Sequence, residues 1–257
     1  MSGEAGEWVQ AWLVSGDGLS RATVAELFDV LDEEERRRAD CLTLAEGRRR
    51  FIVAHGAMRI IVARRLGAPP RDLAWKTGRH GKPELTGQWT GVHVNLSHSG
   101  GLCLVALSGS RPVGADVQQI SPRLDVIAMA GRYFSPQEAR IVADGRDSED
   151  RAQRFAELWS RKEAAVKADG GRLTQVLPCS VVGDGEAVVE IPVSARCGAV
   201  DFPEDALSPS APRDAEATGE VALRYRVKDI PAPPGYRAAV ALSGVGRFTV
   251  ETQTWKP

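Results

Sequence analysis

The chain has 257 residues, a formal net charge of −1 and a hydrophobic content of 43%, which are values typical of a globular protein large enough to bury a core. No apolar run is long enough to cross a membrane and the first residues are too acidic for a signal peptide, so we expect a cytoplasmic protein without membrane contact. The near-zero charge argues against nucleic-acid binding, and an anionic ligand would need a local cluster of cations. The four cysteines have no CxxC spacing, which argues against zinc and fits reduced thiols.

The first part of the chain is predicted to fold as one strand followed by helices. Residues 7–15 alternate weakly between apolar and polar, as in a strand, whereas residues 20–39 carry helix caps and charges. A long helix is expected over about residues 43–66, and Gly67 with the prolines that follow ends it. Its apolar stripe, which should face the core, consists of Phe51, Ala54, Met58, Ile61 and Val62.

The remainder alternates between predicted strands and helices. Three short apolar runs at residues 92–96, 102–107 and 113–117 are separated by turn signals, and their spacing predicts an antiparallel set. Helices are expected at residues 125–133, 136–143 and 150–169, and strands at residues 180–182, 187–191, 221–227, 236–242 and 247–251. Residues 202–219 are polar and rich in Pro, Ser and Asp, which predicts an exposed loop.

A short repeat suggests two related halves. The sequence Val-Ala-Leu-Ser-Gly occurs at residues 105–109 and again at residues 240–244, each time at the end of a predicted strand. Both copies occupy the same place in a helix-then-strands order. We therefore expect an α+β protein with pseudo-two-fold symmetry, divided into residues 1–118 and 119–257. Each half would hold an antiparallel sheet and a packed long helix, with the functional site at the seam between them.

Two acidic residues on different predicted elements could hold a metal ion. With a helical period of 3.6, Trp159, Glu163 and Lys167 lie on one stripe, so an aromatic ring, a carboxylate and a cation follow turn by turn. Asp116 stands in a Val-rich strand, where a carboxylate is costly unless it is paired or binds a cation. Asp116 and Glu163 together would suit Mg²⁺, which prefers oxygen ligands. The alternatives are a surface Glu–Lys pair beside a core tryptophan, and an aspartate that caps a turn.

Two other segments could bind an anion. Asn95–Ser99 follows a predicted strand, and its small donors ahead of two glycines resemble an anion-binding turn. Ser97 and His98 do not form a hydrolase dyad, because neighbours on an extended segment point to opposite faces and no GxSxG elbow is present. His98 could also be a turn histidine with satisfied hydrogen bonds. The basic turn at Lys82 is not a Walker A loop, since Pro83 stands where that loop needs Ser or Thr, and it could be a solvated loop.

Five segments of the chain form an ordered pattern. They are Gly81-Lys82-Pro83, Asn95–Ser99, Gly114-Ala115-Asp116, Phe134-Ser135 with Glu138, and Trp159–Ala164 with Lys167 and Gly170. In this order and spacing, over about residues 48–173, they resemble the 4'-phosphopantetheinyl transferases of the surfactin-synthetase-activating type. The resemblance implies an enzyme that moves the phosphopantetheine arm of coenzyme A to a serine of an apo carrier protein, with Mg²⁺, and releases adenosine 3',5'-bisphosphate. The two-fold pseudo-symmetric α+β architecture of that family agrees with the repeat.

The resemblance also implies roles for individual residues. Asp116 and Glu163 would be metal ligands at the pyrophosphate of coenzyme A and Lys167 would bind that pyrophosphate, so these three are the expected catalytic residues. Gln118 stands where many relatives have a second acid. It could still coordinate the metal or hold a water, but the site has one negative charge fewer. The nucleophile is the partner's serine, and the base would be Glu163 or a metal-bound water.

Further cations would bind the nucleotide part of the coenzyme. The implied cofactor-binding residues are Arg48, Arg49, Lys82, Ser97, His98, Lys162 and Lys167. Ser97 and His98 would contact phosphates of the nucleotide part. Lys82 with one of the two arginines would neutralise other phosphate charge, including the 3'-phosphate, and Lys162 would support the helix or the adenine pocket.

Two other functions remain open at this point. A Mg²⁺-dependent nucleotide phosphohydrolase could use the same acids and cations, and it would consume coenzyme A with no carrier present. A non-catalytic carrier-binding module would tolerate the loss of Glu163, whereas here the acids and lysines are all in place, which favours the enzyme. We expect a monomer whose partners are coenzyme A and the carrier proteins or domains of fatty acid, polyketide or nonribosomal peptide synthases.

Overall fold

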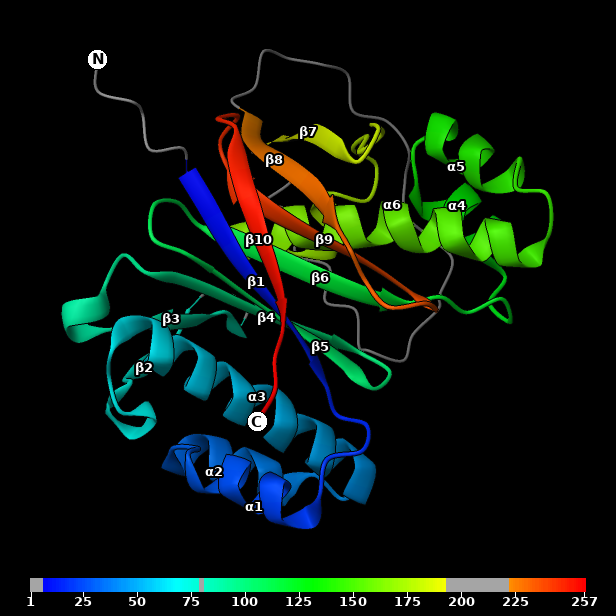
Figure 1. Ribbon diagram of the computed structural model, residues 1–257. Coiled ribbons are helices and arrows are strands. Elements are labelled where there is room, and N and C mark those ends of the chain that lie inside the picture. Colours follow the sequence, from blue (N-terminus) through cyan, green and yellow to red (C-terminus); the bar gives the residue numbers. More distant parts are fainter. Residues whose placement is uncertain (1–6, 79–80, 193–221) are drawn as a thin grey trace, which may run out of the picture.

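The structure, a computed structural model, describes residues 7–78, 81–192 and 222–257 of the chain. Within these ranges the strands form two four-stranded sheets and a two-stranded hairpin, and helices pack on both large sheets (Figure 1). The α+β class predicted from the sequence is therefore confirmed. The loop predicted at residues 202–219 lies outside the described residues. No helix in the described part of the chain is long and apolar enough to span a membrane.

The first large sheet combines strands from both ends of the chain. Its order is β10 (Phe248–Thr254), β1 (Glu7–Ser15), β5 (Leu102–Ser108) and β4 (His93–Ser99). β1 pairs in parallel with β10 and antiparallel with β5, so this sheet is mixed and not purely antiparallel as predicted. The C-terminal strand thereby satisfies the backbone along an edge of β1 that would otherwise remain unpaired.

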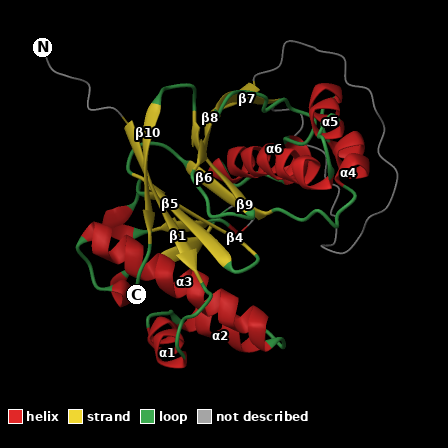
Figure 2. Ribbon diagram, turned by 45° about the vertical axis from the view of Figure 1, so that its right-hand side comes forward, coloured by secondary structure: helices red, strands yellow, loops and turns green. Residues whose placement is uncertain are grey.

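Three helices lie on one side of the first sheet. α3 (Ala45–Leu66) packs on its strands, and α1 (Arg21–Asp29) and α2 (Glu33–Cys41) lie on the far side of α3 (Figure 2). The predicted apolar stripe of α3 is buried in this core, apart from Phe51, which is half-buried against it. Gly67 ends α3 in the left-handed conformation with φ 66°, which glycine adopts without strain.

The second large sheet is antiparallel throughout, in the order β6 (Val113–Gln119), β9 (Tyr236–Ser243), β8 (Ala222–Ile230) and β7 (Glu186–Pro192). The long helix α6 (Ser148–Ala168) packs across this sheet (Figure 2). The remaining elements are α4 (Val126–Tyr133), α5 (Pro136–Ala143), β2 (Trp75–Thr77), β3 (Pro83–Leu85) and the short 3₁₀ helices Pro70–Asp72, Gly87–Trp89 and Leu173–Gln175.

The predicted antiparallel set of three strands is wrong in one respect, because β6 does not pair with β4 or β5. Its ladder partner is β9. Along its other edge, alternate side chains of β4 replace a second ladder: Asn95, Ser97 and Ser99 accept hydrogen bonds from the backbone N–H groups of Ala115, Val117 and Gln119. Alternate residues of a strand point the same way, which lets all three reach that edge. The two large sheets are thus joined by side chains of β4.

Close packing against α6 fixes the position of β6. A Cβ atom on Gly114 would lie 2.0 Å from the carbonyl oxygen of Ala164, so only glycine permits this approach. The strand predicted at residues 180–182 is wrong, because Val181 lies in a loop and donates its N–H to Oε1 of Glu138, not to a neighbouring strand.

The two copies of the repeated pentapeptide lie in β5 and β9 and in the residue that follows each strand. Each of these strands is an inner strand of its sheet. A pseudo-two-fold relation between two halves, and their division after residue 118, stay predictions.

Candidate functional site

A cavity of about 300 Å³ lies where β4, β6 and α6 meet. Its lining residues are Leu96, Ser97, His98, Asp116, Val117, Gln118, Trp159, Glu163 and Lys167. The helical period places the last three on the face of α6 that is turned toward the two strands. Six predicted site residues from three separate elements therefore share one cavity.

Lys167 bridges the two carboxylates of this cavity. Its Nζ lies 2.7 Å from Oδ1 of Asp116 and 3.5 Å from Oε2 of Glu163. Burial raises the pKa of Asp116 and of Glu163, and the ammonium group of Lys167 opposes the rise in both. Burial alone would lower the pKa of Lys167, but the two carboxylates hold it above its ordinary value. The three side chains form one charged cluster, of which Asp116 is the most deeply buried member.

The charged cluster offers a place for a cation beside Asp116. Oδ1 of this residue contacts Ser97 and Lys167, but Oδ2 is buried without a hydrogen-bond partner among the described residues. Such an oxygen is costly, and a hard cation would satisfy it. Residues 7–78, 81–192 and 222–257 contain no group of three His, Cys, Asp or Glu that could hold a metal alone. Asp116, Glu163 and the neighbouring Gln118 would therefore share an ion with oxygens of a ligand, which is how proteins commonly hold Mg²⁺.

The hydroxyl of Ser97 is fully engaged by the protein. It donates to Oδ1 of Asp116 over 2.7 Å, and it accepts from Nζ of Lys167 at 3.2 Å and from the N–H of Val117 at 3.4 Å. A serine hydroxyl has one proton and two lone pairs, and all three are used by these bonds. Its predicted contact with a phosphate stays a prediction. The turn predicted at Asn95–Ser99 is wrong, because these residues belong to β4, whereas the binding of an anion there stays a prediction.

His98 connects this cavity with a second, much smaller one of about 20 Å³. The small cavity is also lined by Arg49 and Arg50 from α3. Arg49 donates to the carbonyl oxygens of Gly16 and Leu19, at 3.0 and 2.8 Å, which holds its guanidinium at this place. Two arginines and a histidine thus lie next to the charged cluster, together with the carboxylates of Asp17 and Glu46. Burial and the ammonium of Lys167 lower the pKa of His98, which favours its neutral form.

Of the three consecutive arginines of α3, Arg49 and Arg50 line the small cavity and Arg48 does not. Arg48 pairs with Asp40 at 2.8 Å and lies over the ring of Phe28, and it lines neither cavity. Arg50 was not predicted, although a count of three residues back from the buried Val53 would have placed it toward the strands. Of the two predicted arginines only Arg49 lines a cavity, and the contact of either with a phosphate stays a prediction.

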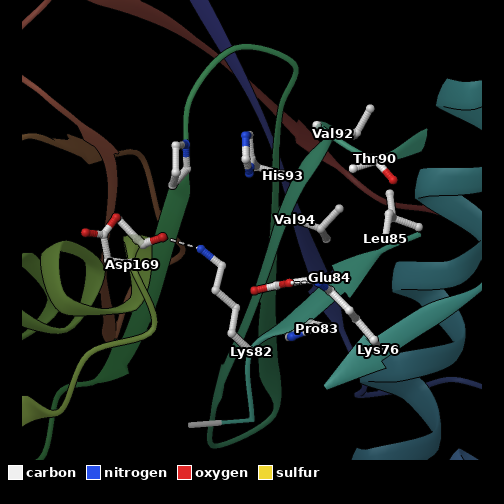
Figure 3. A pocket seen from close by; sticks show the side chains of 13 residues that line it. Lys76, Lys82, Pro83, Glu84, Leu85, Thr90, Val92, His93, Val94 and Asp169 are labelled. Atoms are coloured by element: carbon white, nitrogen blue, oxygen red, sulfur yellow. Dashed lines mark hydrogen bonds and ion pairs between the residues drawn. The ribbon is translucent and has the colours of Figure 1, made fainter. Parts of the chain in front are cut away.

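Lys82 lines a different cavity, also of about 300 Å³, that shares no lining residue with the first (Figure 3). Its Nζ donates to the carbonyl oxygens of Val113, at 2.9 Å, and of Ala168. Burial lowers the pKa of Lys82 to about 8, although the nearby carboxylates of Asp169 and Glu84 act to raise it. In Figure 3 the lysine extends from the start of β3 toward the end of α6. It fastens the hairpin to the two elements that carry the charged cluster.

Lys162 lies in the core and lines none of the three cavities. It is 0% exposed, and its Nζ donates to Oε2 of Glu138 at 2.9 Å and to the carbonyl oxygen of Cys179. The same ammonium lies 5.0 Å from the ring centre of Phe134. A contact between Lys162 and a coenzyme does not fit this geometry, because the side chain is enclosed by α5 and the loop after α6. Its predicted alternative role, support of the helix, fits.

Residues 112–187 match the family model of the 4'-phosphopantetheinyl transferase superfamily. The chain is 33% identical to the putative 4'-phosphopantetheinyl transferase slr0495 of Synechocystis sp., over 66% of this chain and 69% of that protein. It is 31% identical to the 4'-phosphopantetheinyl transferase HetI of Nostoc sp., over 65% and 71% of the two chains. With the 4'-phosphopantetheinyl transferase Sfp of Bacillus subtilis it shares 26% identity over 73% of this chain and 91% of that protein.

Proposed function

Because the chain belongs to the 4'-phosphopantetheinyl transferase superfamily, we propose that it transfers the phosphopantetheine arm of coenzyme A to a serine of an apo carrier protein. The observation that carries the proposal is the charged cluster of Asp116, Glu163 and Lys167. It lies inside the matched residues 112–187, and it holds a buried carboxylate oxygen without a partner. Such a cluster suits a substrate that brings its own negative phosphates and a divalent cation.

The chain's own residues divide the work of the transfer. Asp116 and Glu163, with Gln118, would hold Mg²⁺, which when bound neutralises charge on the pyrophosphate of coenzyme A. Lys167 binds the same pyrophosphate and stabilises the negative charge that grows as the phosphorus–oxygen bond to the leaving nucleotide breaks. Glu163 takes the proton of the attacking serine. Burial raises the pKa of Glu163, which brings the carboxylate closer to the range that suits a base at neutral pH.

The nucleotide end of coenzyme A is assigned to the side of His98. Arg49 and Arg50 lie with this histidine at the small cavity and supply positive charge for the phosphates of that end. The pseudo-two-fold arrangement of two halves belongs to the same proposal, with the active site at their seam. The protein would act as a cytoplasmic monomer on carriers of fatty acid, polyketide or nonribosomal peptide synthases, without nucleic acid or membrane.

One experiment tests the proposal against both alternatives. The protein is incubated with coenzyme A, Mg²⁺ and a panel of apo carrier proteins, and each carrier is weighed by mass spectrometry. Transfer adds one phosphopantetheine group to a carrier and releases adenosine 3',5'-bisphosphate in equal amount. Consumption of coenzyme A without any carrier would instead identify a phosphohydrolase. Carrier binding without a gain in mass would identify a binding module, and a carrier whose acceptor serine is changed to alanine is the matched control.

A further inference from the structure

Ser97 occupies the centre of the charged cluster without carrying a charge itself. Its hydroxyl touches both Asp116 and Lys167, so it links a residue of β6 to a residue of α6. It is 5% exposed, and it lines the cavity together with these two residues. A group in this position can control how the carboxylate and the ammonium are oriented.

The neighbouring polar residues of β4 show what is particular to Ser97. Asn95 and Ser99 also accept a backbone N–H of β6, at 2.9 and 3.0 Å, and thereby join the two sheets. Neither has a hydrogen bond to Asp116 or Lys167. Joining the sheets therefore needs only an acceptor, whereas Ser97 in addition donates its proton to a carboxylate. The hydrogen bond from Ser97 to Asp116 is therefore not needed to join the two sheets.

The donation has a consequence for the geometry of Asp116. The terminal torsion of an aspartate is broad and roughly two-fold, so an unrestrained carboxylate can exchange its two oxygens. Ser97 and Lys167 both contact Oδ1, at 2.7 Å each, which leaves Oδ2 as the oxygen without a partner. Residues that orient a metal ligand in this way are a regular part of metal sites.

We propose that Ser97 is a positioning residue, which fixes the carboxylate of Asp116 and the ammonium of Lys167 for the reaction and does not bind a phosphate of coenzyme A. The inference rests on the proposed transferase function. Its physical basis is that the hydroxyl donates its single proton to Asp116 and accepts hydrogen bonds from Lys167 and from the N–H of Val117.

The test compares four variants for kcat, for KM of coenzyme A and for the affinity of Mn²⁺, measured by electron paramagnetic resonance with coenzyme A present and no carrier. Ser97→Ala removes the donor, and Ser97→Cys keeps nearly the same volume with a weak donor. Ser97→Thr keeps the hydroxyl. Asn95→Ala is the matched control, because it removes another buried acceptor of a β6 N–H without touching Asp116. Thermal unfolding of each variant shows which ones are folded.

Ser97→Ala and Ser97→Cys should lower kcat and weaken Mn²⁺ binding by about 10- to 100-fold, which is the usual loss when a ligand-orienting residue is removed. Their KM for coenzyme A should stay within about threefold of the wild type, since no ground-state contact with the coenzyme is lost. Ser97→Thr should restore both kcat and Mn²⁺ affinity. Asn95→Ala should lower the unfolding temperature but leave Mn²⁺ binding unchanged.

Three results would overturn the inference. A raised KM with unchanged kcat in Ser97→Ala and Ser97→Cys would make Ser97 a ligand of coenzyme A. Equal losses of Mn²⁺ affinity in Asn95→Ala would reduce Ser97 to a part of the sheet junction. A folded Ser97→Thr variant without recovery would exclude the hydroxyl as the active group. If the wild type modifies no carrier at all, the transferase proposal fails, while the Mn²⁺ measurements still decide the role of Ser97.

Discussion

Two lysines stand five residues apart on α6 and have opposite surroundings. Lys162 is enclosed in the core, with one carboxylate, one carbonyl oxygen and one aromatic ring around its ammonium group. Lys167 is 30% exposed at a cavity and is shared between Asp116 and Glu163. The buried pair of Lys162 and Glu138 stabilises the structure, because each charge already has its partner. The charged cluster of Asp116, Glu163 and Lys167, which is open to the cavity and is called the open cluster below, leaves one carboxylate oxygen of Asp116 without a partner among the described residues. Such a cluster is suited to a ligand that supplies the missing positive charge.

The largest effect of a substitution is expected at the buried pair of Lys162 and Glu138, called the enclosed pair, and it should be a loss of stability. Lys162→Met leaves the fully buried carboxylate of Glu138 without its counter-ion, which should cost about 3–5 kcal/mol of the free energy of unfolding. Urea titration measures this loss. The double variant Lys162→Met/Glu138→Gln removes the unpaired charge and should recover a large part of it.

Activity separates this role from a role in catalysis. The folded fraction of the double variant should keep kcat and KM for coenzyme A near wild-type values, because Lys162 lines none of the cavities. A tenfold change in KM in a variant that is fully folded would contradict the division between the two lysines.

The next largest effect is expected at the open cluster and should concern rate. Asp116→Asn and Glu163→Gln keep the size of each side chain but remove a negative charge next to the bound cation. Each should lower kcat by about 100-fold or more, which corresponds to roughly 3 kcal/mol of transition-state stabilisation. Carrier mass against time measures the rate, and thermal unfolding serves as the control for the fold. Near wild-type turnover in both variants, with unchanged unfolding temperatures, would contradict the assignment of the metal ligands.

The sequence predicted the open cluster well because its members follow simple periods. Trp159, Glu163 and Lys167 obey the helical period, and a carboxylate in a Val-rich strand is unusual enough to stand out at Asp116. The long helix α3 and its buried stripe could be predicted for the same reason. Local periodicity reports which face of one element is buried, and these predictions needed nothing more.

The remaining differences depend on which element lies next to which. Lys162 and Lys167 are both lysines of α6. Lys162 differs because α5 packs over it and supplies its partner Glu138, which the sequence does not show. The hydrogen bonds of Ser97 to Asp116 and to the N–H of Val117 were not predicted, since the sequence cannot show that β6 lies beside β4. The parallel pairing of β10 with β1 joins residues about 240 positions apart, and no local pattern encodes such a contact.

Lys82 lies between the two extremes, and a smaller effect of pH is expected from it. Its pKa is lowered to about 8 by burial, from 10.5 in the unfolded chain. Between these values the unfolded state binds more protons than the folded state, so the contribution of Lys82 to stability rises as the pH rises. Relative to Lys82→Met, the wild type should gain about 2–3 kcal/mol of unfolding free energy from pH 7 to pH 10.5.

A neighbouring lysine provides the control for this pH effect. Lys76 belongs to the same hairpin, and its side chain is 63% exposed, so Lys76→Met should show no such trend with pH. Urea titrations at half-unit steps of pH measure all three proteins. A difference between wild type and Lys82→Met that stays constant over this range would show that the lysine is no harder to charge in the fold than in the unfolded chain.

The smallest expected effect concerns Gln118, which lines the cavity of the open cluster as a neutral amide. Gln118→Glu adds a negative charge beside a divalent cation, and an added attraction of about 1 kcal/mol should lower the half-saturating Mg²⁺ concentration roughly fivefold. The reaction and its products should not change. Gln119→Glu is the matched control, because this neighbour points to the other side of β6 and is exposed. An equal shift in both variants would mean a general effect of surface charge, whereas no shift in Gln118→Glu would mean that residue 118 does not approach the metal. A shift in Gln118→Glu alone would show that residue 118 is a third ligand position beside the carboxylates of Asp116 and Glu163. The buried pair of Lys162 and Glu138 has no space for a further ligand.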